Sequence, residues 1–276
     1  MILSKRAKNT AALVLKALCT LLYISPFYIV LVYAVKSKKE LALDRLAFPT
    51  SIHWQNFTDG IEQSHFFRAL GNSLVTTVVC VLVLTLVCSM SAYILARRHS
   101  RFYTAMYYLM LAATLVPFQA IMTPLYKNLK WMGLIDTLSG FSLVKISFEV
   151  AFTTLVITGF VKNIPYELEE AAMIDGTGAY GTFFRIVLPL MKPILCTSAV
   201  LNVLSVWNDF QISVVLLQAE EVRTLSLTQY YFFGKNSVAL GMAFAVFLLS
   251  MIPVLTVYFT LQKYIVSGIT AGAVKG

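Results

Sequence analysis

Six long apolar stretches dominate the pattern of hydrophobic and polar positions along this chain. A hydrocarbon core roughly 30 Å thick requires about 20 apolar residues in a helix, and each stretch meets that length. Since the bilayer core holds no water, a helix is expected because it satisfies its own backbone groups. The stretches are 11–35, 69–96, 102–126, 137–160, 193–217 and 236–262. The pattern predicts an all-α integral membrane protein with six transmembrane helices.

Composition supports the same class of protein. Of the 276 residues, 58% are hydrophobic and only 13% are charged, and the mean hydropathy is +0.76. A soluble domain of this length would need more polar surface. The net charge of +9 does not indicate nucleic acid, because the basic residues lie between apolar stretches, where they fix topology and meet anionic lipid headgroups.

The polar segments between the stretches predict the domain organisation. We expect a cytoplasmic N-terminus over residues 1–10, one six-helix domain over 11–262 and a cytoplasmic tail over 263–276. An external loop would span 36–68 and a cytoplasmic loop 161–192. Three arginines crowd a short segment, Arg97, Arg98 and Arg101, and basic residues in short loops favour the inner side. The first apolar run is too long for a signal peptide and is expected to stay uncleaved.

No enzyme or metal site is expected on this chain. The sequence holds no GxxxxGK[ST], HExxH or GxSxG pattern, so neither phosphate binding nor hydrolytic catalysis is indicated. The four cysteines lie in apolar stretches and the three histidines are scattered, without the convergent spacing that zinc sites need. We therefore expect no catalytic residue and no cofactor here.

The segment 163–189 is too long for a simple connection between spans. Pro165 suits the first turn of a helix, and Glu167, Glu169 and Glu170 stand where the helix dipole favours negative charge. Glycines follow and Pro189 closes the segment, so two short helices joined at a bend are predicted, with Pro189 ending the second. Two alanines leave one face of the first helix open to another surface. An amphipathic helix lying on the membrane is the alternative, but the acidic first turn argues against adhesion to anionic lipid.

The spacing of this segment resembles the EAA loop of bacterial type I ABC importer permeases. Its specified positions are met by Glu170, Ala171, Ala172, Gly176, Ile186, Leu188 and Pro189. In that family the loop contains a coupling helix that docks in a groove of the ATPase subunit, and its glutamate pairs with a basic residue there. The resemblance implies that role for Glu170 and an interface that also includes Asp175.

Further segments are similar to the carbohydrate-uptake permeases within that family, of the maltose type. They are 117–120, 124–126, 207–210 and the tail 267–276. In the maltose-type subunit the tail reaches between the ATPase subunits, which implies contacts for Ala273, Val274, Lys275 and Gly276. The resemblance further implies a bacterial plasma membrane protein with two copies of an ATPase holding ATP and magnesium, a second and different permease, and an extracytoplasmic solute-binding protein.

Charged residues inside the predicted spans form the candidate solute path. Lys145 and Glu149 are four residues apart on the fourth span, so they share a helix face and can neutralise each other. They either hold neighbouring helices together or line a cavity that binds solute hydroxyls. Trp207, Asn208 and Asp209 on the fifth span are a second candidate set, for packing or for sugar binding. Gln119 on the third span completes the candidates.

Two other functions remain open to the sequence. An ion- or proton-coupled secondary transporter would explain Lys145, Glu149 and Asp209 but not the spacing of the loop. A membrane scaffold without transport of its own is the third alternative. The sequence does not indicate which solute is carried, although the resemblance favours a sugar or oligosaccharide.

Overall fold

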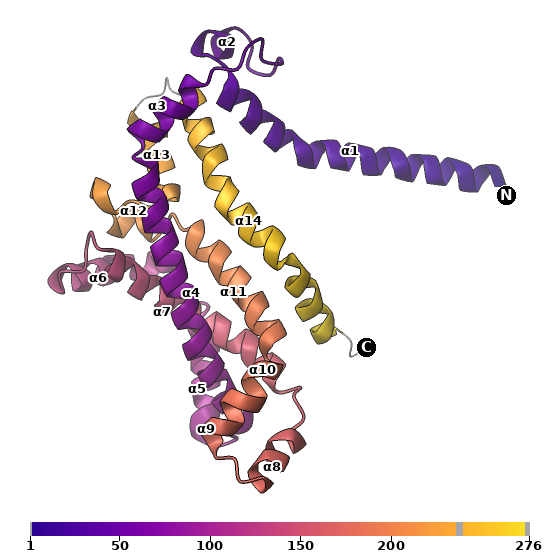
Figure 1. Cartoon of the computed structure of the whole chain (residues 1–276), viewed down its shortest axis with the longest axis vertical. Helices are drawn as coiled ribbons and strands as arrows, with labels where there is room; N and C mark the ends of the chain where they lie inside the picture. Colours follow the sequence, from indigo (N-terminus) through magenta and orange to yellow (C-terminus); the bar gives the residue numbers. More distant parts are fainter. Residues whose placement is uncertain (1, 236–239, 274–276) are drawn as a thin grey trace. The chain divides into compact units, whose positions relative to one another are not determined.

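The chain is described here from a computed structural model, which gives the backbone of residues 2–235 and 240–273 and the side chains of 9–230 and 240–260. Every regular element in these residues is a helix (Figure 1). Four segments are long and apolar enough to cross a membrane: Asn9–Val35, Phe66–Arg97, Leu138–Val161 and Leu240–Thr260. Two bent helix pairs raise the number to six if each pair is one span. The all-α membrane fold is thus confirmed, and six spans result when each bent pair is counted as one.

The third and fifth spans are bent, which the sequence reading did not predict. The third consists of α5 (Arg101–Ala113) and α6 (Phe118–Trp131), which meet at 100°. Pro117 precedes α6 as its extended N-cap, because proline has no N–H and disfavours helix in the residue before it. In the fifth, Ala179–Leu190 meets α11 (Lys192–Trp207) at 73°. This span ends at Trp207 rather than at residue 217.

The contacts divide the chain into two compact units, and the first comprises residues 1–67 and 228–252. It holds α1 (Ile2–Val35), α2 (Lys38–Leu43), α3 (Gln55–Gln63) and the first part of α14 (Leu240–Ala273). Helix α1 begins at Ile2, so residues expected as a separate N-terminal segment continue the first helix. Buried Asn56 of α3 donates to the carbonyls of Ala34 at 2.9 Å and Lys36 at 2.8 Å, which fixes α3 against the end of α1.

The second unit comprises residues 68–227 and 253–276. Besides α5, α6 and α11 it contains these elements: α4 (Phe66–Arg97) from residue 68 onward, α7 (Leu138–Val161), α8 (Glu167–Ile174), α9 (Ala179–Thr182), a π-helix (Phe183–Val187), α10 (Leu188–Leu190), α12 (Ser213–Leu216), a 3₁₀ turn (Glu220–Val222), the start of α13 (Leu225–Lys235) and α14 from residue 253 onward. The functional candidates that the sequence predicts, as far as their side chains are described, all lie in this unit.

Helices α4 and α7 run parallel in contact. One stripe of α4, with a spacing of four residues, is buried: Cys80, Leu84, Cys88, Ala92 and Ala96. The thiol of Cys80 lies 3.8 Å from the carbonyl oxygen of Ser142. The thiol of Cys88 lies 3.6 Å from the carbonyl oxygen of Val150. The offset between partners is 62 residues in both pairs, so both helices advance in the same direction. Small residues permit this close approach between membrane helices.

An acidic side chain organises the segment after α1. Ser37 and Glu40 form a capping box at the start of α2. The Glu40 carboxylate also accepts hydrogen bonds from the hydroxyl and the amide of Thr50, the amide at 3.0 Å. The Thr50 hydroxyl and then the Ser37 amide are the main causes that lower the pKa of Glu40 from 4.5 to about 2. The ionised carboxylate therefore stabilises this turn.

We predict that this turn loosens in acid. Because the folded pKa of Glu40 is about 2 against a usual 4.5, its stabilisation is present above pH 4.5 and is lost as pH falls toward 2. Residue-resolved hydrogen exchange should show protection of the Thr50 amide falling over that range. In Glu40→Gln the protection should be lower and independent of pH. Constant protection of Thr50 in the unmodified chain down to pH 2 would contradict the prediction.

Candidate functional site

The loop between α7 and α11 contains two short helical pieces joined at a bend, as predicted. Helix α8 begins at Glu167, two residues after Pro165, and ends at Ile174. Gly176 has a φ of +80°, a conformation that glycine adopts without steric cost. The second piece is longer than predicted. It runs from Ala179 through a π-helical segment to Leu190, so Pro189 does not end it and the chain turns at Met191.

The motif residues divide between an open face and an inner face. Glu170, Ala171, Asp175, Gly176 and Pro189 are exposed, whereas Ile186 and Leu188 are partly buried. Ala172 is only 5% exposed, so the expectation that both alanines lie on the open face was wrong for this residue. Its short side chain instead faces the protein. Ile174, next to the bend, is 86% exposed and gives the open face a large apolar contact.

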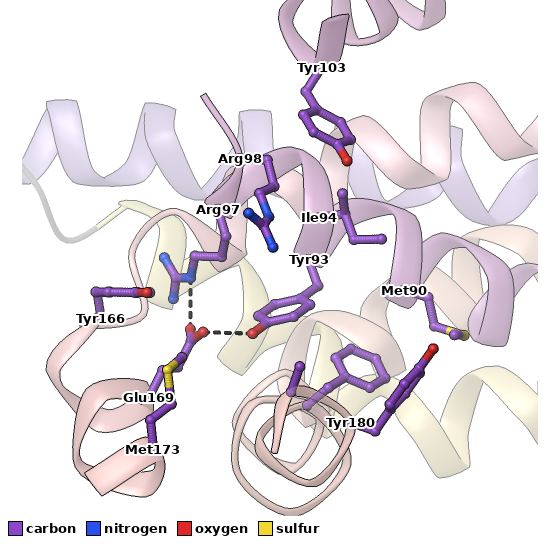
Figure 2. A pocket seen from close by; sticks show the side chains of 12 residues that line it. Met90, Tyr93, Ile94, Arg97, Arg98, Tyr103, Tyr166, Glu169, Met173 and Tyr180 are labelled. Atoms are coloured by element: carbon purple, nitrogen blue, oxygen red, sulfur yellow. Dashed lines mark hydrogen bonds and ion pairs between the residues drawn. The ribbon is translucent and has the colours of Figure 1, made fainter. Parts of the chain in front are cut away.

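The residue that attaches α8 to the rest of the unit is Glu169, to which the sequence reading assigned no contact. Its side chain is 1% exposed. One carboxylate oxygen lies 2.7 Å from Nε of Arg97, and the other accepts a hydrogen bond of 2.7 Å from the hydroxyl of Tyr93 (Figure 2). Both partners belong to the last two turns of α4. Buried carboxylates persist only when charge and hydrogen bonds compensate their lost hydration.

Arg97 binds the loop at two further points. Its Nη2 donates to the carbonyl of Ile164 at 2.9 Å, and its guanidinium lies 5.7 Å from the ring centre of Tyr166. We call Glu169, Arg97 and Tyr93 the Glu169 cluster. Glu169 and Ala172 are three residues apart and form the buried face of α8. That spacing is the signal that could have distinguished Glu169 from the exposed Glu170 in the sequence.

The second helical piece is attached by apolar packing. Phe183, Val187 and Met191 are buried in one core cluster with residues of α4, α7 and α11. The other members are Leu84, Cys88, Ala92, Ala96, Ile157, Val161, Ile164 and Ile194. Interiors of this kind are close-packed and transmit displacement. A force applied to the open face of the loop therefore reaches α4, α7 and α11 together.

The three charged residues that the sequence predicts inside spans meet in one network. Nζ of Lys145 lies 3.0 Å from Glu149 Oε1, 3.2 Å from Asp209 Oδ2 and 3.0 Å from the hydroxyl of Ser205, which donates to Glu149. We call these four residues the Lys145 cluster. The predicted pairing of Lys145 with Glu149 is confirmed, and the structure adds Ser205 and Asp209. Two carboxyl groups thus share one buried ammonium group.

Asp209 does not lie within the fifth span, contrary to the sequence reading. Helix α11 ends at Trp207, and Asp209 follows in the break before α12. Its Oδ1 accepts hydrogen bonds from the amides of Ile212 at 3.2 Å and Ser213 at 3.0 Å, while its Oδ2 contacts Lys145. The carboxylate thus stabilises the break and joins it to α7.

The remaining path candidates lie elsewhere. Trp207 is buried and lines an apolar cavity of about 240 Å³ with residues of α4 and α14 such as Val78 and Pro253. The Asn208 amide donates back to the carbonyl of Leu204 at 3.0 Å, and Gln119 is exposed on α6. No described hydrogen bond joins these three residues to the Lys145 cluster. Of the tail, Ala273 is described only as the end of α14, and Val274, Lys275 and Gly276 lie outside the described residues.

Comparison with known proteins identifies the class. Residues 89–271, which contain the whole loop, match the family of binding-protein-dependent transport system inner membrane components. The chain belongs to this family. It is thus a multi-pass membrane protein and the permease component of an ABC importer, not a secondary transporter.

Particular relatives are similar over nearly their whole length. The chain is 33% identical to the melibiose/raffinose/stachyose import permease protein MelC of Bacillus subtilis, over 95% of both chains. It is 34% identical to AmyC of Thermoanaerobacterium thermosulfurigenes, a probable starch degradation products transport permease, over 93% of both. Among solved structures, a chain of a bacterial ABC transporter that imports alginate superposes with a TM-score of 0.83 at 25% identity, covering 95% of this chain and 97% of that one.

We predict that Arg97→Ala detaches α8. Removing one partner of a buried ion pair costs about 3 kcal/mol, which corresponds to roughly a hundredfold larger open population. Tryptic cleavage after Lys162 and Arg185, exposed residues that flank α8, should accelerate accordingly in the purified chain. Arg98→Ala is the control, because Arg98 is a neighbouring basic residue that forms no ion pair with any described residue. This variant should be cleaved at the same rate as the unmodified chain. Equal rates for the two variants would show that the Glu169 cluster does not hold the loop.

Proposed function

We propose that this chain imports a sugar or oligosaccharide by forming a translocation path with a second, different permease, and that the loop 161–192 couples the path to an ATPase. The observation that carries the proposal is the division of the loop. Its motif presents Glu170, Ala171 and Asp175 outward, while the neighbouring Glu169 is buried against α4. A segment that only connected two spans would not need a rigid attachment behind an open face.

The open face fits a docking surface for another protein. Small Ala171 permits close approach, Ile174 supplies apolar area, and the Glu170 carboxylate is free to meet a basic residue. One chain supplies one such loop, so two ATPase subunits acting together require two permeases. ATP and magnesium would reside on the ATPase chains, and this chain would make and break no covalent bond.

The attachment explains how ATPase motion would reach the path. The Glu169 cluster joins α8 to α4, and the core cluster joins the second helical piece to α4, α7 and α11. The Lys145 cluster lies on α7 and at the end of α11. Closure of the ATPase dimer would therefore move α7 and α11 with the loop and change access to the path.

The cargo is proposed from the relatives and the partners from the family resemblance. The named relatives carry melibiose, raffinose and stachyose or starch products, which supports an oligosaccharide. A binding protein outside the membrane would deliver it. Basic residues near Arg97 favour the loop and both termini on the cytoplasmic side of a bacterial plasma membrane.

We predict that Glu170→Lys abolishes co-purification of the ATPase and ATP-driven uptake, because it places like charges across the interface. Glu62→Lys is the matched control, since Glu62 is an exposed residue of the loop 36–68, which we propose to lie on the external side, and it should retain both. The readouts are subunit ratios after affinity purification and uptake of labelled solute. Full complex formation and uptake with Glu170→Lys would overturn the coupling role. Uptake in ATP-depleted cells under an imposed ion gradient would overturn ATP coupling itself.

Within the Lys145 cluster, we propose that Glu149 contacts the solute. Its side chain is 17% exposed, against 7% for Lys145 and 7% for Asp209. Lys145 is the shared partner of both carboxylates, so its first role is to hold α7 to the end of α11. Of the two roles that the sequence left open, we therefore propose helix attachment for Lys145 and solute contact for Glu149.

We predict a different defect for each residue. Glu149→Gln should leave assembly intact, because Lys145 keeps Asp209, but should weaken solute affinity or import rate about tenfold, the value of one charged hydrogen bond. Lys145→Met leaves two carboxylates without a cation and should lower the yield of assembled complex. Affinity is read from concentration-dependent uptake and yield from size-exclusion chromatography. An assembled Glu149→Gln complex with unmodified affinity and rate would remove Glu149 from the path.

A further inference from the structure

A cavity of about 640 Å³ lies behind the loop, separate from the face proposed for the ATPase. It is bounded by the last turns of α4, the first turn of α5 and residues of α8, α9 and the π-helix. Figure 2 shows its side chains converging, with Arg98 and Tyr103 on the side away from the loop helices. Neither the importer function nor the coupling role gives this space an occupant.

The cavity has an excess of positive charge. Its lining residues include Arg97, Arg98 and one acidic residue, Glu169. Glu169 is already bound to Arg97 at 2.7 Å, so that pair is neutral. Arg98 is exposed and has no acidic partner among the described residues. Tyr103 belongs to the first turn of α5, where the helix dipole adds positive potential. The charge left at this end fits an anion.

The opposite wall of the cavity is apolar. Ile94 and Met90 of α4 lie about one and two turns before Arg98, and they remain 44% and 37% exposed. Phe183 and Tyr180 continue this wall from the loop. A free phosphate would use only the basic end. An occupant that uses both ends needs an anionic head and a hydrocarbon chain.

The position of the cavity agrees with such an occupant. Helix α4 is a membrane span that ends at Arg97, and the bent third span begins at Arg101. The cavity therefore lies where two spans leave the bilayer, at the depth of lipid headgroups. We propose that it binds an anionic phospholipid from the leaflet on the side of the loop, with the phosphate at Arg98 and an acyl chain along Met90 and Ile94.

The test uses the full-length chain purified in neutral detergent and titrated with phosphatidylglycerol or phosphatidylcholine of the same acyl chains. Native mass spectrometry reports the dissociation constant of the first bound lipid. One basic residue near a phosphate gives about fivefold tighter binding. Phosphatidylglycerol should thus bind about fivefold more tightly than phosphatidylcholine, and Arg98→Gln should abolish that preference while phosphatidylcholine binding is unchanged.

The matched control is Arg101→Gln, which removes the same charge from an exposed residue three positions away that does not line the cavity. It should keep the preference. If both variants lost the preference for phosphatidylglycerol equally, the binding would reflect diffuse surface charge and the proposed site would be overturned. An unchanged preference in Arg98→Gln would also overturn it. Displacement of phosphatidylglycerol by equimolar glycerol 3-phosphate would overturn the lipid assignment, since that probe lacks the acyl chains.

Discussion

The carboxylate of Glu169 is buried beside the end of a membrane span, and this constraint determines how the loop is attached. A carboxylate without water must find charge and hydrogen bonds from the protein. Arg97 and Tyr93 supply both, at 2.7 Å each. Since the three side chains come from α4 and α8, their pairing fixes the orientation of α8. The same orientation turns Glu170 and Ile174 outward, so the buried contact creates the open face.

The Lys145 cluster applies the same principle within the membrane. Lys145 alone on α7 would be costly in the bilayer, and so would the acidic groups near it. Together with Ser205 they satisfy one another and hold α7 to the point where α11 ends. Thus two paired-charge clusters, one at the loop and one in the span, are joined through α7 and α11. Apolar packing between them provides stiffness, and the charges provide fixed positions.

Sequence reasoning predicted the elements better than the partners. The two short helices and the bend at Gly176 followed from proline, glycine and charge positions, because these act locally on the backbone. The 100° break at 114–117 was missed, since the run 102–126 carries no charged residue and its length alone suggested one straight helix. Ala172 was placed on the wrong face because the motif marks it as small without indicating what approaches it.

The sequence by itself determined that the chain spans a membrane, that it carries an importer-type loop, and that Lys145 and Glu149 share a face. Each of these depends on composition or on short spacing along one helix. Only the tertiary structure decided that Glu169 meets Arg97, 72 residues away, and that Lys145 meets Asp209 beyond the end of α11. Pairings between separate helices depend on their packing, and hydrophobic patterns leave that packing open because every span is apolar on most of its faces.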